Sequence, residues 1–160
     1  MDSEGLFDFA PYMYHVLMPP IIHYGVAHPW LCDALGHLNT RNYHAMYDDA
    51  LFVFLAIIGC PSGAGASVRY GFVDVRNELE YFNEVAAGAV IKIQSVVEKL
   101  GKKSMTVALR MTAIDDSITV SSMKAVMVCM DMQSRTPSII PEELRTKINP
   151  FTAGPSLPDQ

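Results

Sequence analysis

The residues with the clearest chemical potential form a polar cluster, Asp33, Gly36, His37 and Asn39, just ahead of a long apolar segment. A carboxylate close to the start of a helix lies near the first N–H groups of that helix, which have no partner inside it. Such N–H groups can hold the oxyanion that develops when a carbonyl carbon is attacked. Asp33 could then act as the nucleophile or as the base for water. The spacing is compatible with acyl transfer, although an Asp at this position can also simply tighten a turn.

Other chemistries have weaker support in the sequence. His37 and His44 are seven residues apart, and no zinc-hydrolase pattern such as HExxH is present, so no metal site is expected. Cys32 has no evident base, and the neighbouring Asp33 disfavours a thiolate, so a thiol nucleophile is not expected. A GxSxG motif is also missing. We therefore expect no metal and no redox cofactor.

The apolar segment at residues 39–58 is predicted to form one long helix. Its apolar residues recur with a period of 3.6 and largely fill the opposite face too. Asn39 or Thr40 is a natural N-cap, and Gly59 with Pro61 would end the helix. A helix of this length spans about 30 Å. We expect it to be buried on nearly all sides, so other elements must wrap it.

The rest of the chain is predicted to form strands. One short run precedes the helix, and four longer runs follow it, separated by turn signals; the expected strands are 21–27, 70–81, 89–100, 103–114 and 118–132. Long strands joined by short turns form an antiparallel meander. The expected fold is α+β, a long central helix wrapped by a curved antiparallel sheet of about five strands. Its uncovered edges favour an oligomer.

Length and composition indicate one domain without affinity for nucleic acid. The 160 residues favour a single core, expected at residues 19–150, with an N-terminal arm at 1–18 and a flexible tail at 151–160. The net charge of −5 disfavours binding to nucleic acid. The longest apolar run is about half a membrane span, and the acidic start is unlike a secretory signal. Three cysteines without a CxxC pair indicate reduced thiols, so a cytoplasmic protein without membrane contact is expected.

The run DALGHLNTRNY, from Asp33 to Tyr43, resembles the D-x-x-G-H-x-N-x-x-x-Y signature of the hotdog-fold thioesterases of the 4-hydroxybenzoyl-CoA thioesterase family. The later run LGKKS, residues 100–104, is similar to the basic turn before the next-to-last strand of that family. The likeness in element order extends over residues 21–148. It implies a hotdog fold and an acyl-CoA thioesterase that releases free coenzyme A and a carboxylic acid.

The resemblance also implies roles for individual residues. Asp33 matches the acidic residue that attacks the thioester carbonyl or activates water. Thr40 falls where a backbone N–H polarises that carbonyl, with Asn39 and Arg41 as near alternatives. From the residues themselves, His37 is expected to order the loop or to contact the substrate, and Tyr43 to contact the substrate. The positions that match the coenzyme A phosphate site are Lys102, Lys103 and Ser104. Because the family's site lies between subunits, a homodimer or a dimer of dimers is implied.

Two departures from the family pattern bear on these roles. The Glu that some branches carry further along the helix has only Asp48 and Asp49 as counterparts, which we expect to be solvated. Ala34 to Gly36 replace the aromatic or proline often found after the Asp, so the acyl group stays open between aryl and aliphatic. The same architecture also serves acyl dehydratases and non-catalytic acyl-CoA-binding proteins, and these remain the alternatives.

Overall fold

The computed structural model describes residues 19–60 and 68–152. The expected arm at 1–18 and the tail from 153 onward lie outside these residues. The elements, in chain order, are β1 Ile21–Val26, η2 Pro29–Leu31, α1 Thr40–Ile57, β2 Tyr70–Tyr81, β3 Val90–Leu100, β4 Ser104–Ala113, β5 Thr119–Asp131, β6 Thr136–Pro137, α2 Glu142–Ile148 and η3 Asn149–Phe151. The four long strands and β1 are confirmed, each end within one residue of its expected position.

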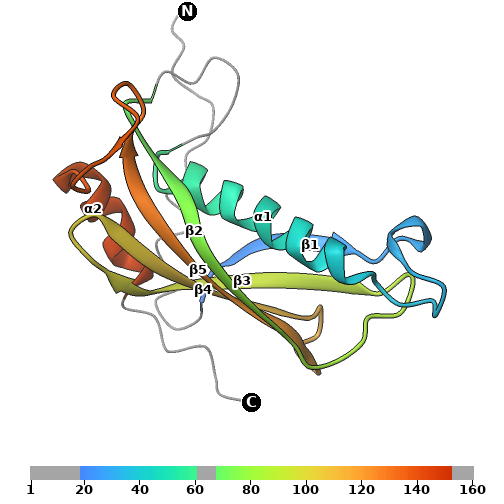
Figure 1. The fold of residues 1–160 in the computed structure, drawn as a ribbon. Coiled ribbons are helices and arrows are strands. Elements are labelled where there is room, and N and C mark those ends of the chain that lie inside the picture. The colour runs from blue at the N-terminus through green and yellow to red at the C-terminus, as the bar shows by residue number, and fades with distance from the viewer. Residues whose placement is uncertain (1–18, 61–67, 153–160) are drawn as a thin grey trace, which may run out of the picture.

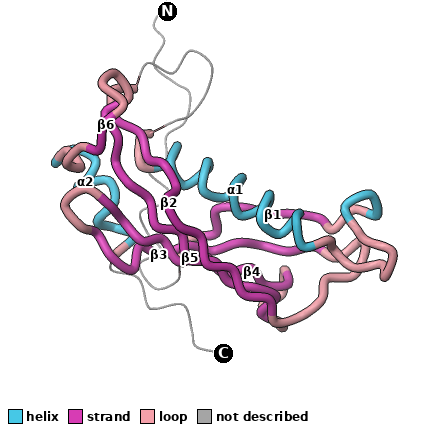
Figure 2. Tube along the Cα trace, viewed as in Figure 1, coloured by secondary structure: helices cyan, strands magenta, loops and turns pink. Residues whose placement is uncertain are grey.

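The strands form one curled antiparallel sheet around α1. Their order across the sheet is β1-β3-β4-β5-β2, and the short β6 pairs with the end of β5. Figure 1 shows α1 lying along the concave side of the sheet, with α2 beside the end of the sheet where α1 finishes. Figure 2 shows the same arrangement, with strands surrounding the helix on one side only. The expected fold class is therefore confirmed.

The central helix begins at the cap that the sequence predicts. The Asn39 side chain accepts a hydrogen bond from the N–H of Arg41, and α1 starts at Thr40. Gly59 follows the last turn with φ +85, a left-handed conformation that ends helices and suits glycine. The apolar stripe faces the sheet, and the buried residues are Tyr43, Met46, Tyr47, Ala50, Leu51, Phe54 and Leu55.

The prediction that α1 is buried on nearly all sides is wrong. Phe52 and Val53 on the opposite face are 49% and 42% exposed. The physical reason is that the sheet curls around only one side of the helix. The apolar pattern alone could not reveal this, because a helix with apolar residues on both faces can be covered on one face or on both.

Two side-chain contacts fix α1 along its length. In its middle, the buried Tyr47 hydroxyl lies 2.8 Å from the Ser121 hydroxyl on β5. Near its end, Phe54 packs edge to face against Phe151, with ring centroids 5.2 Å apart. The second contact carries the folded chain past residue 150, the expected domain boundary. Within the described residues no helix is long and apolar enough to cross a membrane.

Candidate active site

The loop that carries Asp33 folds back on the Asp33 carboxylate. The N–H of Leu35 donates to Asp33 Oδ1 at 2.8 Å, and that of His37 donates to the same oxygen at 3.4 Å. The backbone closes as well, because Asp33 N donates to His37 O at 2.9 Å and Gly36 N to Asp33 O at 3.0 Å. Asp33 is exposed, and Oδ2 accepts no hydrogen bond from the described part of the chain. One oxygen is thus anchored and the other is available to a reacting group.

The connection between β2 and β3, residues 82–89, holds this loop in place. Leu38 N donates to Val85 O at 2.8 Å, and the N–H of Ala87 donates to Gly36 O at 3.1 Å. His37 Nε2 lies 3.4 Å from a carboxylate oxygen of Glu84. No sequence pattern marks this connection as part of the site. Nothing in its composition signals a role, because the pairing arises only when the sheet folds.

At the start of α1, the N–H of Thr40 has no partner within the part of the chain that the structure describes. Of the three candidate donors, Asn39 donates its N–H to Leu31 O at 3.0 Å, and Arg41 donates to the Asn39 side chain at 3.2 Å. The Thr40 N–H makes no hydrogen bond among residues 19–60 and 68–152. An unpaired N–H at the positive end of an 18-residue helix can stabilise a developing oxyanion.

Tyr43 lies one turn further along α1 and joins the same group of residues. It is 4% exposed and packs edge to face with Tyr81 at the end of β2, with centroids 5.2 Å apart. Burial raises the pKa of its hydroxyl; a hydrogen bond to the Val85 backbone opposes the rise, and the charges of Glu84 and Asp33 add to it. The structure therefore gathers the expected residues Asp33, His37, Asn39, Thr40 and Tyr43 at the N-terminal end of α1.

Replacing Asn39 by Ala should destabilise this end of the helix. The variant loses the cap to Arg41 N–H, so we expect the free energy of unfolding to fall by about 1 kcal/mol in a denaturant titration. Asn39→Ser is the matched control, because a serine hydroxyl can accept the same hydrogen bond. Equal stability of the Ala and Ser variants would show that the cap contributes nothing.

The expected phosphate-binding residues lie elsewhere in the subunit. Lys102 and Lys103 form the turn between β3 and β4, and Ser104 begins β4. Their backbone is tied to neighbouring elements, since Ile140 N donates to Lys102 O at 2.9 Å and Cys129 N to Lys103 O at 2.8 Å. This turn is at the α2 end of the sheet, where α1 finishes (Figure 1).

Within one subunit Asp33 and the Lys102–Lys103 turn are at opposite ends of the sheet. β3 begins at Val90 beside the connection that holds the Asp33 loop, and it ends at Leu100 beside the lysines. Its 11 residues span about 35 Å. The structure therefore does not bring the two parts of the expected site together in one chain.

Charge is distributed unevenly between the two ends. Seven of the 12 Lys and Arg residues lie toward the α2 end, namely Arg69, Lys99, Lys102, Lys103, Arg135, Arg145 and Lys147. The opposite end carries Asp33, Glu84 and the turn acids Asp115 and Asp116, together with Arg41 and with Lys92, which pairs with Asp116. In residues 19–60 and 68–152, no three His, Cys, Asp or Glu side chains gather in a way that could hold a metal ion.

Comparison with solved structures shows the same fold in several proteins. A Staphylococcus aureus protein solved in complex with CoA aligns with a TM-score of 0.75 at 17% identity, over 90% of this chain and 92% of that chain. A Pseudomonas aeruginosa protein gives 0.71 at 23% identity, over 84% and 96%. A 1,4-dihydroxy-2-naphthoyl-CoA thioesterase from Synechocystis gives 0.68 at 12% identity, over 79% and 93%.

Sequence comparison identifies the family. A search of the curated proteins gave no match. The family model of the Thioesterase-like superfamily, however, matches residues 27–148, a span that contains both the Asp33 loop and the Lys102–Lys103 turn. The chain therefore belongs to the Thioesterase-like superfamily, which supports the predicted enzyme class, a thioester hydrolase.

Proposed function

We propose that the protein is an acyl-CoA thioesterase that hydrolyses an aryl- or acyl-CoA thioester to free coenzyme A and a carboxylic acid. One observation carries the proposal: at the start of α1 the Asp33 carboxylate lies near the Thr40 N–H, and among the described residues neither Asp33 Oδ2 nor that N–H has a hydrogen-bond partner. A carboxylate and an oxyanion donor are the two groups that acyl transfer requires. Membership of the superfamily makes a thioester the expected substrate.

In the proposed reaction the thioester carbonyl oxygen accepts a hydrogen bond from Thr40 N–H. Asp33 either attacks the carbonyl carbon, forming an anhydride that water then hydrolyses, or takes a proton from a water that attacks the same carbon. In both routes the C–S bond breaks, coenzyme A leaves as the thiol, and the acyl group leaves as the acid. Negative charge on the carbonyl oxygen in the transition state is stabilised by the helix N-terminus.

Within the superfamily we place the chain with the 4-hydroxybenzoyl-CoA thioesterases. The support is the run from Asp33 to Tyr43, in which every conserved letter of that family's signature is present. Asp33 and Thr40 are seven positions apart, and the hydrogen-bonded loop between them connects the acid to the start of α1. His37 and Tyr43, at the same end of α1, are the proposed substrate contacts.

The substrate's coenzyme A would be held by a second subunit. Its phosphates need cations, and the expected group, Lys102 with Lys103 and Ser104, follows the far end of β3 from the Asp33 loop in the same chain. A homodimer in which the subunits run in opposite directions would put the basic end of one beside the Asp33 end of the other. We infer that the active form is such a dimer, and that it is cytoplasmic, in keeping with three free thiols.

The proposal is tested by following thiol release from a panel of aryl, short, medium and long acyl-CoA esters with a colorimetric thiol reagent. We expect one class to be hydrolysed well above the rate without protein. Tight binding of the esters without thiol release would contradict the proposed activity and favour a non-catalytic acyl-CoA-binding protein.

A further inference from the structure

The face of the sheet that points away from α1 has a buried strip on β3 and β4. Ile93 and Val97 on β3 belong to the core around α1, so Gln94 and Val96, which alternate with them, point to the outer face. On β4, Ala108 lies opposite Val96. We call Gln94, Val96 and Ala108 the outer strip, and their exposed fractions are 8%, 6% and 5%. Apolar side chains on the outer face are therefore shielded from water.

The described helices do not cover the outer strip. The buried side chains of α1 and α2 all belong to the core around α1, and this core does not include Val96 or Ala108. Outer residues on the neighbouring strands are exposed, namely Tyr24 on β1 and Lys124 on β5. The burial is thus confined to the outer strip and does not come from the curl of the sheet.

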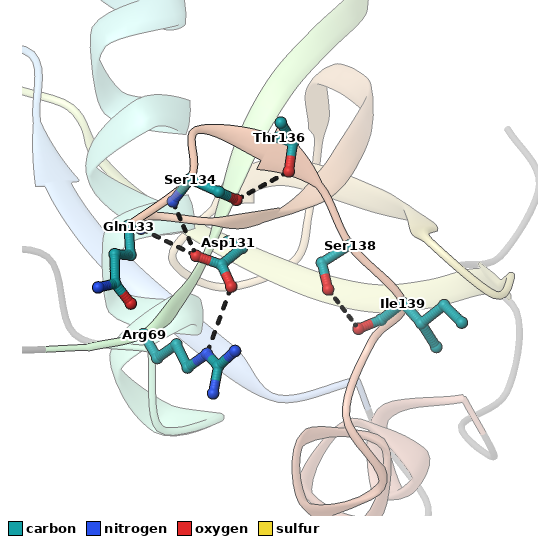
Figure 3. A network of polar contacts seen from close by, with 7 residues as sticks. All are labelled: Arg69, Asp131, Gln133, Ser134, Thr136, Ser138 and Ile139. Carbon is teal, nitrogen blue, oxygen red and sulfur yellow. Dashed lines mark hydrogen bonds and ion pairs between the residues drawn. The ribbon is translucent and has the colours of Figure 1, made fainter.

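The described turns make their contacts elsewhere. After β4, an Asp116 carboxylate oxygen lies 2.6 Å from Lys92 Nζ and so covers the outer residue that precedes Gln94 on β3. Between β5 and β6, Asp131 accepts hydrogen bonds from two N–H groups of the turn and lies 3.3 Å from Arg69 Nε (Figure 3). Within the part of the chain that the structure describes, these contacts leave the outer strip without a cover.

The described chain begins beside the outer strip. The Gln94 side-chain amide donates to Pro19 O at 3.0 Å, and Ser95 N donates to Pro20 O at 3.2 Å. Because the Gln94 side chain is on the outer face, this hydrogen bond holds Pro19 toward that face. The 18 residues that precede Pro19 reach up to about 60 Å, whereas neighbouring strands are about 5 Å apart. The arm, residues 1–18, is therefore attached within reach of β3 and β4.

The composition of the arm suits the outer strip. Its large apolar and aromatic side chains include Leu6, Phe7, Phe9, Tyr12, Tyr14, Val16 and Leu17. The arm also carries Asp2, Glu4 and Asp8 but no Lys or Arg. On the outer face, the half-buried Arg110 lies opposite Gln94, and a cation that leaves water is stabilised by a nearby carboxylate. The arm thus matches the outer face in both polarity and charge.

The two other parts of the chain outside the described residues suit the outer strip less well. Residues 61–67, PSGAGAS, have no large apolar side chain, and residues 153–160 have only Leu157. Residues 61–67 must also connect α1 to β2, which is at the edge of the sheet far from β3.

We propose that the arm binds the outer strip of its own chain, with its aromatic side chains against Val96 and Ala108 and its carboxylates toward Arg110. The hydrogen bond at Pro19 favours the same chain over a second copy, because it fixes the end of the arm beside Gln94. Burial of apolar surface drives the binding. The bound arm closes this face to a second copy, so the proposed dimer does not pair further through it. The proposal does not rest on the thioesterase activity.

Limited digestion of the full chain with chymotrypsin measures whether the arm is bound. The protease cuts after accessible aromatic residues, which the arm carries, and mass spectrometry identifies the shortened product. Val96→Glu places a charge beneath the arm and should raise the rate of this cleavage about tenfold, because cleavage follows the population of the released arm. Val90→Glu is the matched control on the same face of β3, where Val90 is 42% exposed, and its cleavage rate should equal that of the wild type.

A double-mutant cycle in the full chain gives an independent measurement. Replacing Phe7, Phe9, Tyr12 and Tyr14 together by Ser produces an arm that cannot bind through aromatic side chains. Val96→Glu should lower the thermal midpoint of the wild-type chain by about 8 °C, because the glutamate is then buried. In the serine background the same exchange should cost less than about 2 °C, because the glutamate meets water. Val90→Glu should cost less than about 2 °C in both backgrounds.

Faster arm cleavage in Val96→Glu alone, together with a smaller Val96→Glu shift in the serine background, supports the proposal. Equal cleavage rates for the two Glu variants, or equal Val96→Glu shifts in both backgrounds, would overturn it. A second copy on the outer strip would instead appear as a lower mass of Val96→Glu by light scattering with unchanged arm cleavage, which would also overturn it. None of these measurements uses turnover, so failure of this proposal and failure of the proposed function are distinguishable.

Discussion

Replacing Asp33 by Asn is expected to lower kcat for acyl-CoA hydrolysis about 1,000-fold, the scale on which loss of a general base or nucleophile acts. An amide can neither attack the thioester carbon effectively nor accept a proton from water. The measurement is thiol release at saturating substrate, with variant and wild type at equal concentration.

The fold should survive this change. The amide oxygen that Asp33→Asn introduces can still accept from the N–H groups of Leu35 and His37, which close the loop. We therefore expect a thermal midpoint within a degree or two of the wild type. Asp48→Asn, which removes an exposed carboxylate on α1, is the matched control and should leave kcat unchanged. Near-normal turnover by the Asp33 variant would remove Asp33 from the mechanism.

Replacing Lys102 and Lys103 together by Ala should raise KM for coenzyme A esters about tenfold and leave kcat nearly unchanged. Charge-assisted hydrogen bonds to phosphate would be lost, and about 1.4 kcal/mol of binding energy corresponds to a factor of ten. A pantetheine thioester lacks the nucleotide phosphates, so its KM should change less than twofold. The comparison of the two substrates is the measurement.

The double lysine variant is also expected to fold normally. The contacts that tie this turn to the rest of the protein use the backbone oxygens of Lys102 and Lys103, which alanine retains. Lys124→Ala, an exposed lysine on β5, is the control for the loss of positive charge. Equal losses with the coenzyme A ester and the pantetheine ester would argue against phosphate binding by this turn.

Local patterns account for the features that the sequence predicted well. The alternation in β4 and the turn residues around Gly101 and Asp116 each depend on neighbouring residues, and the strands appear where these signals place them. The Asn39 cap is equally local, because its hydrogen bond spans two residues. The cluster from Asp33 to Tyr43 gathers at one end of α1 because it is contiguous in the chain.

Features that depend on distant segments were not predictable. The hydrogen bonds between residues 82–89 and the Asp33 loop join backbone groups about 50 positions apart. The composition of residues 82–89 gives no sign of this pairing. The exposed face of α1 at Phe52 and Val53 follows from how far the sheet curls. The separation of Asp33 from Lys102 follows from the direction of β3, since the two motifs sit at opposite ends of that strand.

The measurement that tests the two-subunit site most directly uses mixed dimers. Subunits carrying Asp33→Asn and subunits carrying Lys102→Ala with Lys103→Ala are co-expressed with different affinity tags, and the mixed dimer is purified by both tags. If Asp33 of one subunit works with the lysines of the other, one of the two sites is intact, and kcat/KM for a coenzyme A ester should be about half that of the wild type. If each site lies within one subunit, no intact site exists, and kcat/KM should be about one twentieth of the wild-type value, which would contradict the account.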